Sequence, residues 1–128
     1  MKAQFILYVK DQTRSKNFYQ RLLNIKPSLD VPGMTEFELS EECKIGLMPE
    51  DGIAKILSGQ VPHPSEGNGI PRCELYLYVQ DIQQYFDRAI KSSAKLISDI
   101  QNRDWGDKAC YFADPDGHII AFAERISE

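Results

Sequence analysis

The sequence has few cysteines and lacks any long apolar run. Its three cysteines, Cys43, Cys73 and Cys110, are odd in number and widely spaced, so they indicate neither a disulfide framework nor a cysteine zinc site. We expect them to be small core residues and not catalytic thiols. No segment approaches the roughly 20 apolar residues of a membrane-spanning helix. Strand-like sequence follows Met1 almost directly, with no signal peptide, which predicts a cytoplasmic protein without a membrane partner.

A marked excess of one charge is also missing. The chain has 15 Lys+Arg against 19 Asp+Glu, a formal net charge of -4, with both signs interspersed. Because no basic stripe is available to neutralise phosphates, we do not expect a nucleic-acid partner. The 128 residues are 42% hydrophobic, which is enough to bury a core in one ordinary domain or two very small ones.

The first part of the chain predicts a strand, a helix and three further strands. The β-branched and aromatic run 5–9 predicts the first strand, and Asp11 or Thr13 can cap the helix that follows. Apolar residues recur three and four positions apart along that helix, which Asn24 and Pro27 end. Three weaker strands are predicted at 26–29, 35–39 and 44–48. The apolar helix residues are Phe18, Tyr19, Leu22 and Leu23.

The same order of elements returns after a connector rich in proline and glycine. The connector covers about residues 49–72, with a turn of helix predicted near 53–57. A strand at 75–79 and a helix capped by Asp81 follow, and then three strands at 95–100, 109–113 and 118–124. The last two strands are joined by the tight turn 114–117.

These repeated elements predict an internal duplication. Sliding the chain by about 70 residues places 7–11 on 77–81, and the later elements agree in order. Each copy reads βαβββ, and neither can bury its sheet face alone. We therefore expect one domain over 1–128, with module 1 at about 1–48 and module 2 at about 73–128.

Five segments resemble a known superfamily. They are residues 8–11, 17–19 and 22–23 of the first module, and above all 104–118 followed by 119–124. The last two contain a Trp-Gly step, a strand, an Asp-Pro-x-Gly turn and a final apolar strand. The sequence is similar to the vicinal oxygen chelate superfamily of glyoxalase I, bleomycin resistance proteins and extradiol dioxygenases, and is closest in motif to the bleomycin resistance branch. The resemblance implies an α+β fold in which paired βαβββ modules form curved mixed sheets around a cleft, and a homodimer whose chains share that cleft.

Metal-dependent members of this superfamily take ligands from the first and last strands of each module. The resemblance places these positions at Gln4, Gly46, Glu74 and Ala121. Only Glu74 is a strong ligand, and Gly46 and Ala121 offer no donor atom, so we expect no metal cofactor. Alternation along the last strand would turn the other candidates, Glu124 and His118, to the opposite face.

Strand alternation predicts what lines the cleft in place of a metal. If Gln4 and Glu74 face it, every second residue of their strands does so too, while the residues between them face the helices. An aromatic cavity with a few polar groups suits a small-molecule ligand, although the same side chains can instead fill the sheet surface. We expect Phe5, Leu7, Val9, Leu75, Leu77 and Val79 toward the helices; the ligand-binding residues are predicted to be Gln4, Ile6, Tyr8, Gly46, Glu74, Tyr76, Tyr78, Trp105, Tyr111 and Ala121.

Three functions are compatible with these residues. The first is a metal-free protein that binds a small molecule, cationic or aromatic, without transforming it. The second is a lyase similar to glyoxalase I, with a divalent metal ion as cofactor and Glu74 as its catalytic base. The third is a nonenzymatic regulatory domain. His63 and His118 are expected to be solvated and to take no part.

Overall fold

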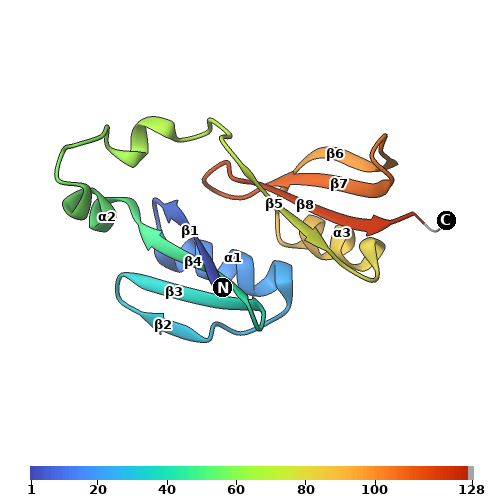
Figure 1. Cartoon of the computed structure of the whole chain (residues 1–128), viewed down its shortest axis with the longest axis horizontal. Helices are drawn as coiled ribbons and strands as arrows, with labels where there is room; N and C mark the ends of the chain where they lie inside the picture. The colour runs from blue at the N-terminus through green and yellow to red at the C-terminus, as the bar shows by residue number, and fades with distance from the viewer. Residues whose placement is uncertain (127–128) are drawn as a thin grey trace. The chain divides into compact units, whose positions relative to one another are not determined.

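The computed structural model describes residues 1–126 and divides into two compact units, Met1–Asn68 and the segment from Gly69 onward. Each unit contains one four-stranded sheet (Figure 1). The first unit consists of β1 (Ala3–Val9), α1 (Gln12–Leu23), β2 (Leu29–Val31), β3 (Met34–Ser40), β4 (Cys43–Pro49), α2 (Glu50–Leu57) and the 3-10 helix η1 (Pro64–Gly67). The second consists of β5 (Glu74–Tyr78), α3 (Ile82–Lys91), β6 (Lys95–Asn102), β7 (Asp107–Ala113) and β8 (Ile119–Arg125).

The two sheets have the same topology. Their strand orders are β1-β4-β3-β2 and β5-β8-β7-β6. In each sheet the first strand runs parallel to the last strand of its unit, and the other neighbours are antiparallel. The βαβββ order predicted from the repeated sequence pattern is therefore present twice, and the predicted α+β class is confirmed.

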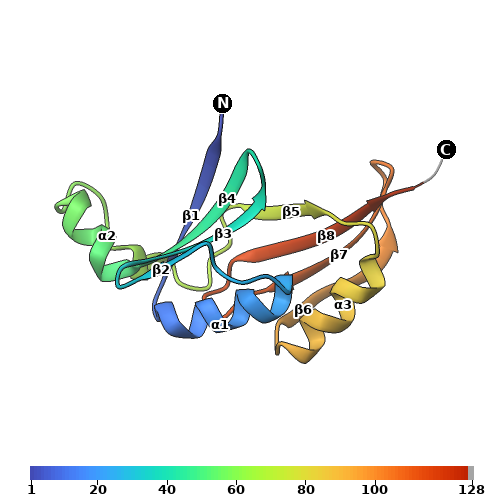
Figure 2. The same cartoon turned by 90° about the horizontal axis from the view of Figure 1, so that it is seen from below.

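One helix covers one face of each sheet (Figure 2). Helix α1 begins where the Asp11 carboxylate accepts a hydrogen bond from the Arg14 amide at 3.0 Å, and it ends at Asn24 in the left-handed conformation. Helix α3 is capped by Asp81 and begins at Ile82, whose amide donates to the Glu124 carboxylate at 2.6 Å. Glu124 thus lies on the helix side of its sheet, as alternation predicts.

The apolar cores lie under these helices. In the first unit Phe37, Ile45 and Leu47 are fully buried with the apolar side of α1, and in the second Phe112 and Phe122 are fully buried. The second core is largely aromatic, because Tyr85 and Phe86 of α3 stack on the two phenylalanines with centroid distances of 5.0 and 5.4 Å. Burial of this kind supplies most of the stability of a small unit.

The start of the second strand and the exposure of Phe5, Cys43 and Cys73 differ from the sequence prediction. The second strand begins at Leu29 and not at 26, because Pro27 has no amide proton to pair. Phe5 is 56% exposed, so this end of β1 lies beyond the helix-covered core. Only Cys110 is a core cysteine, with a pKa raised by burial to about 11, while Cys73 is exposed in the connector and Cys43 is half-buried.

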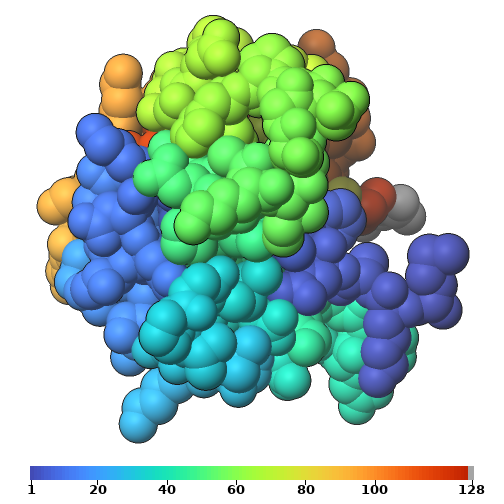
Figure 3. All heavy atoms as spheres, turned by 90° about the vertical axis from the view of Figure 1, so that its left-hand side faces the viewer, coloured from blue at the N-terminus to red at the C-terminus, as the bar shows by residue number. Residues whose placement is uncertain are grey.

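Both histidines have hydrogen-bond partners, and His118 is less exposed than predicted. Nε2 of His63 lies 3.0 Å from the Asp51 carboxylate, and its Nδ1 accepts from the Ser65 amide at 3.1 Å, which links α2 to η1. His118 is half-buried and bonds to Asp114 in the β7–β8 turn. The predicted helical turn of the connector is the longer α2, which packs against β1 and β4 and is visible in green in Figure 3.

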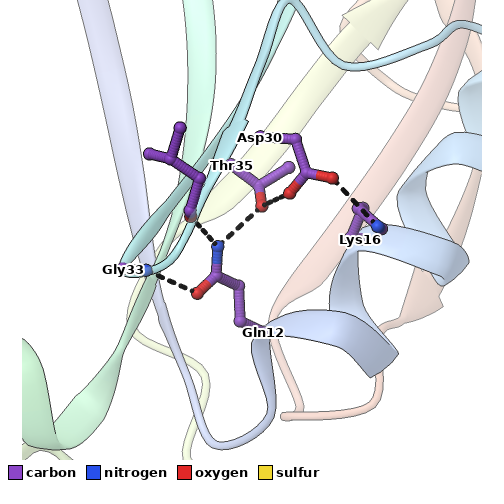
Figure 4. A network of polar contacts seen from close by, with 6 residues as sticks. Gln12, Lys16, Asp30, Gly33 and Thr35 are labelled. Carbon is purple, nitrogen blue, oxygen red and sulfur yellow. Dashed lines mark hydrogen bonds and ion pairs between the residues drawn. The ribbon is translucent and has the colours of Figure 1, made fainter.

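A polar network fixes the β2–β3 hairpin to the start of α1 (Figure 4). The Gln12 amide donates to the Val31 carbonyl at 2.8 Å and to the Thr35 hydroxyl at 2.9 Å, and its oxygen accepts from the Gly33 amide. Lys16 pairs with Asp30 at 2.9 Å, and this bond lowers the pKa of that carboxyl. A hollow of about 410 Å³ lies here, but the polar groups of the network are paired with one another, so we interpret it as a structural clamp.

Candidate functional site

In each unit one long helix, α1 or α3, packs against one face of the sheet, and we call the opposite face the open face. The strand pairing on this face is equivalent in the two units. Ile6 of the first strand pairs with Gly46 of the last strand in the first unit, and Tyr76 pairs with Ala121 in the same way in the second. All ten residues predicted to bind a ligand lie on these faces or at their edge. Gln4, Ile6, Tyr8 and Gly46 are in the first unit, and Glu74, Tyr76, Tyr78, Trp105, Tyr111 and Ala121 are in the second.

The open face of the first unit centres on Glu36, which the sequence analysis did not select. Its carboxylate accepts from the Gln4 amide at 2.8 Å and from the Lys44 ammonium at 3.1 Å. The bond from Gln4, followed by that from Lys44, outweighs partial burial and lowers the pKa of Glu36. Both oxygens of this carboxylate are therefore occupied. The sequence does not distinguish Glu36 from the other polar residues of β3, which alternate with apolar ones. Only the strand register shows that Glu36 lies next to Gln4.

Gly46 lies beside this group and has no free space next to it. A Cβ added at Gly46 would be 2.6 Å from Nε2 of Gln4 and 3.1 Å from the sulfur of Met34. The Gln4 amide thus occupies the space into which a metal ligand at position 46 would project.

The open face of the second unit centres on Asp107, a second residue that the sequence analysis did not select. Its Oδ2 accepts from the hydroxyls of Tyr76 at 2.8 Å and Tyr78 at 3.0 Å, whose rings meet edge to face with centroids 5.4 Å apart. The indole of Trp105 donates to the Tyr76 hydroxyl at 2.9 Å. Gly106, at φ +93°, provides the left-handed conformation that turns the chain just after Trp105, so the Trp-Gly step serves to place the indole.

Asp107 is 1% exposed, and its Oδ1 is buried without a hydrogen bond. Burial, together with the bond to Asp107, raises the pKa of the Tyr76 hydroxyl to about 12, against the weaker opposite effect of Trp105. The bond to Asp107 also raises the pKa of Tyr78. Both hydroxyls are therefore neutral donors at physiological pH. Asp107 was missed because the strand was predicted to begin at 109, whereas β7 begins at Asp107 itself.

The remaining predicted residues differ in exposure. Tyr111 is half-buried under the Arg103 guanidinium, which lies 5.1 Å from its ring centroid. Burial, followed by the nearby charge of Glu74, raises the pKa of Tyr111. Glu74 itself is exposed at the start of β5, and Ala121 is fully buried. Trp105 is 58% exposed, so the indole is available to a ligand.

These residues do not fit a divalent metal centre. In the first unit Gln4 is directed to Glu36, which already binds an ammonium group, and position 46 is blocked. In the second unit Glu74 is the only donor at the implied ligand positions, because Ala121 has none. A stable site needs three or four directed ligands.

A cluster in the β7–β8 turn fastens a hairpin. The ligand atoms of Asp114, Asp116 and His118 lie within 4.8 Å of one another. The Asp114 carboxylate, however, accepts from the amides of Asp116 at 2.9 Å and His118 at 2.8 Å, and meets Nδ1 of His118 at 2.9 Å. This is the geometry of an Asx turn with a histidine partner. Among the described residues, no helix is long and apolar enough to cross a membrane.

Comparison with known proteins agrees with this fold. The chain is 25% identical over 125 residues to an uncharacterised protein of Mycobacterium bovis, covering 95% of this chain and 82% of that protein. It superposes on a glyoxalase-related enzyme from Fulvimarina pelagi with a TM-score of 0.82 at 19% identity, covering 98% and 88% of the two chains. For a glyoxalase/bleomycin resistance protein/dioxygenase family enzyme from Burkholderia phytofirmans the TM-score is 0.81 at 14% identity, covering 96% and 97%. Residues 2–127 match the model of the glyoxalase-like domain. The chain therefore belongs to the glyoxalase-like domain family of the vicinal oxygen chelate superfamily.

Proposed function

We propose that this protein binds a small organic molecule, without a metal ion and without transforming it, on the open face of the second unit. The observation that carries the proposal is the group of Tyr76, Tyr78 and Trp105 arranged around the buried carboxylate of Asp107. The rings offer exposed planar surface, and the hydrogen bonds that join them hold that surface in place before any ligand arrives. Preorganised aromatic groups bind with a small loss of conformational entropy.

The carboxylates of this face favour a ligand that is aromatic, cationic or both, and the guanidinium groups of Arg103 and Arg125 already lie over two of its tyrosine rings. Asp107 lies behind the rings, and Glu74 is exposed on the same face. A carboxylate behind an aromatic surface attracts a positive group placed over the rings.

We also propose that the protein is a homodimer. The open face of the first unit exposes several large apolar side chains, which a partner surface would cover. Size-exclusion chromatography with light scattering should give twice the mass of the chain at micromolar concentration, and a monomer mass would contradict this part of the proposal. The exposed residues are Ile6, Tyr8, Leu29 and Val31.

A thermal-shift screen against cationic and neutral aromatic compounds tests the binding function. A compound present at a hundred times its dissociation constant adds about 2.7 kcal/mol to the stability of the protein. Trp105 is the single tryptophan of the chain, so a compound that binds here should also change the intrinsic fluorescence. Trp105→Ala should abolish the thermal shift, whereas Trp105→Phe, which keeps a ring, should retain part of it.

Elemental analysis tests the metal-free part separately. The dialysed protein should contain no stoichiometric nickel, zinc, iron or manganese. Retained metal that is lost in a Glu74→Ala variant would overturn the proposal in favour of a metal-dependent lyase of the glyoxalase I type.

A further inference from the structure

A positive side chain of the protein itself lies over the aromatic group of the second unit. The Arg125 guanidinium is 5.4 Å from the ring centroid of Tyr78 and donates to its hydroxyl at 3.3 Å. Its Nε lies 3.9 Å from Oδ1 of Asp107, too far for a hydrogen bond. The face thus already holds a cation above a ring and beside a buried carboxylate oxygen that has no hydrogen-bond donor.

We propose that Arg125 occupies the place of the ligand's cationic group and is displaced when the ligand binds. This inference rests on the proposed function and narrows the ligand to organic monocations that carry an aromatic ring and a cationic N–H group one carbon away from it, such as arylamidinium or arylmethylammonium ions. The ring would lie against Tyr78 and Trp105, and the N–H group would bond to Oδ1 of Asp107.

The attachment of Arg125 is weak enough for displacement. Its side chain is 69% exposed, and it is the last residue of β8, paired across the strands with Asp107. Arg103 shows the contrast within the same unit: it is half-buried, and its Nη2 donates to the Ala109 carbonyl at 2.9 Å and the Ser98 hydroxyl at 3.0 Å. Arg103 is fixed by the fold, whereas the Arg125 side chain is held by one long hydrogen bond, a ring contact and an ion pair with Asp107 at 3.9 Å.

The free acceptor on Asp107 explains why an N–H group is needed. A buried carboxylate oxygen without a donor is costly, and a cationic donor that reaches it forms a charge-assisted hydrogen bond. The two tyrosine hydroxyls bind Oδ2 and leave Oδ1 without a hydrogen bond. A quaternary ammonium ion would gain the ring contact but could not satisfy this oxygen.

The experiment compares four proteins and three probes by isothermal titration calorimetry. The probes are benzamidinium, its neutral analogue benzamide, and benzyltrimethylammonium. The proteins are the wild type, Arg125→Ala, Asp107→Asn and Arg88→Ala. Arg88 is a matched control, because its guanidinium also lies over a tyrosine ring of this unit, 4.5 Å from the centroid of Tyr85, and its removal changes the net charge equally.

The wild type should prefer benzamidinium to both other probes by at least about fivefold. Arg125→Ala removes the competing cation and should tighten benzamidinium binding by about threefold or more, while Arg88→Ala leaves it unchanged. Asp107→Asn should weaken benzamidinium binding by about tenfold. The oxygen of the asparagine amide would keep accepting from the tyrosine hydroxyls, so its NH2 group would replace Oδ1, and an NH2 group cannot accept a hydrogen bond from the ligand. Since Arg125 is exposed, its variant folds even if Asp107→Asn does not.

Other outcomes separate the two proposals. Weaker or equal benzamidinium binding by Arg125→Ala would overturn the displacement, as would equal tightening by Arg88→Ala. If benzamide or benzyltrimethylammonium binds as tightly as benzamidinium, the N–H cation inference is wrong while the binding function stands. If neither these probes nor any compound of the thermal-shift screen binds, the proposed function itself fails.

Discussion

Replacement of Gly46 by alanine tests whether the Gln4 amide really fills the space beside it. The new Cβ would lie 2.6 Å from Nε2 of Gln4, closer than such atoms approach, so the amide must rotate away from Glu36. The hydrogen bond that is lost ends on a carboxylate but lies at a partly exposed position, so it is worth about 1 kcal/mol. Alanine in a strand gains about 0.5–1 kcal/mol over glycine by restricting the unfolded chain.

These two contributions nearly cancel in the wild-type background. Gly46→Ala should therefore change the free energy of unfolding by less than about 0.5 kcal/mol. In a Gln4→Ala background the collision with the amide is absent, and the same substitution should stabilise the protein by about 0.5–1 kcal/mol. The double-mutant cycle should thus give a coupling energy of about 1 kcal/mol, above the few tenths expected for independent sites.

Urea unfolding followed by far-ultraviolet circular dichroism measures the four free energies. A second readout is the pKa of Glu36 by nuclear magnetic resonance titration, because the Gln4 bond is the largest cause of its lowered value. That pKa should rise toward its ordinary value of 4.5 in Gly46→Ala. Equal effects of Gly46→Ala in both backgrounds, with the Glu36 pKa unchanged, would refute the argument that position 46 is blocked.

Three further predictions concern other parts of the chain. Gln12→Ala removes three hydrogen bonds that hold the β2–β3 hairpin and should destabilise the first unit by about 1–3 kcal/mol, with faster amide exchange at Gly33 as the local sign. Asp114→Ala leaves two amides of the β7–β8 turn without an acceptor and should lower stability by about 2 kcal/mol, measured by thermal unfolding, while Asp116→Ala, which keeps that acceptor, serves as its control. In alkaline solution the Tyr76 hydroxyl should ionise near pH 12 by ultraviolet titration. Because its folded pKa lies above the ordinary value of 10.0, its contribution to stability is complete below pH 10 and is lost as the pH rises toward 12.

Much of the fold can be predicted from local sequence. Helix α1 follows from a capping aspartate, an apolar residue at every third or fourth position and an asparagine in the left-handed conformation at its end. The duplicated order of strands follows from the repeated run before Asp11 and Asp81. The second strand was predicted to begin at 26 instead of Leu29, because the apolar residues around Pro27 match a strand pattern. Backbone pairing begins only after the proline.

The site was predictable only in part, because hydrogen bonds across a sheet depend on register. Alternation along β1 and β5 predicts which side chains share a face, and it places Tyr76 and Tyr78 together. It does not identify Asp107, which lies on another strand 29 residues from Tyr78 in sequence and precedes the predicted start of its own strand. Glu36 could not be predicted for the same reason, because its partner Gln4 lies 32 residues away in the sequence.

The two units differ in how the carboxylate of the open face is satisfied, and this difference argues for ligand binding by the second. In the first unit Glu36 holds an ammonium group and an amide, so its charge is neutralised within the chain. In the second unit Asp107 receives two neutral hydroxyls on one oxygen and none on the other, with Arg125 beyond hydrogen-bond distance. A buried carboxylate left incomplete in this way costs stability unless another donor is supplied. In the part of the chain that the structure describes, Oδ1 of Asp107 is the one buried side-chain nitrogen or oxygen without a hydrogen bond, and the proposed cationic ligand would supply the missing donor.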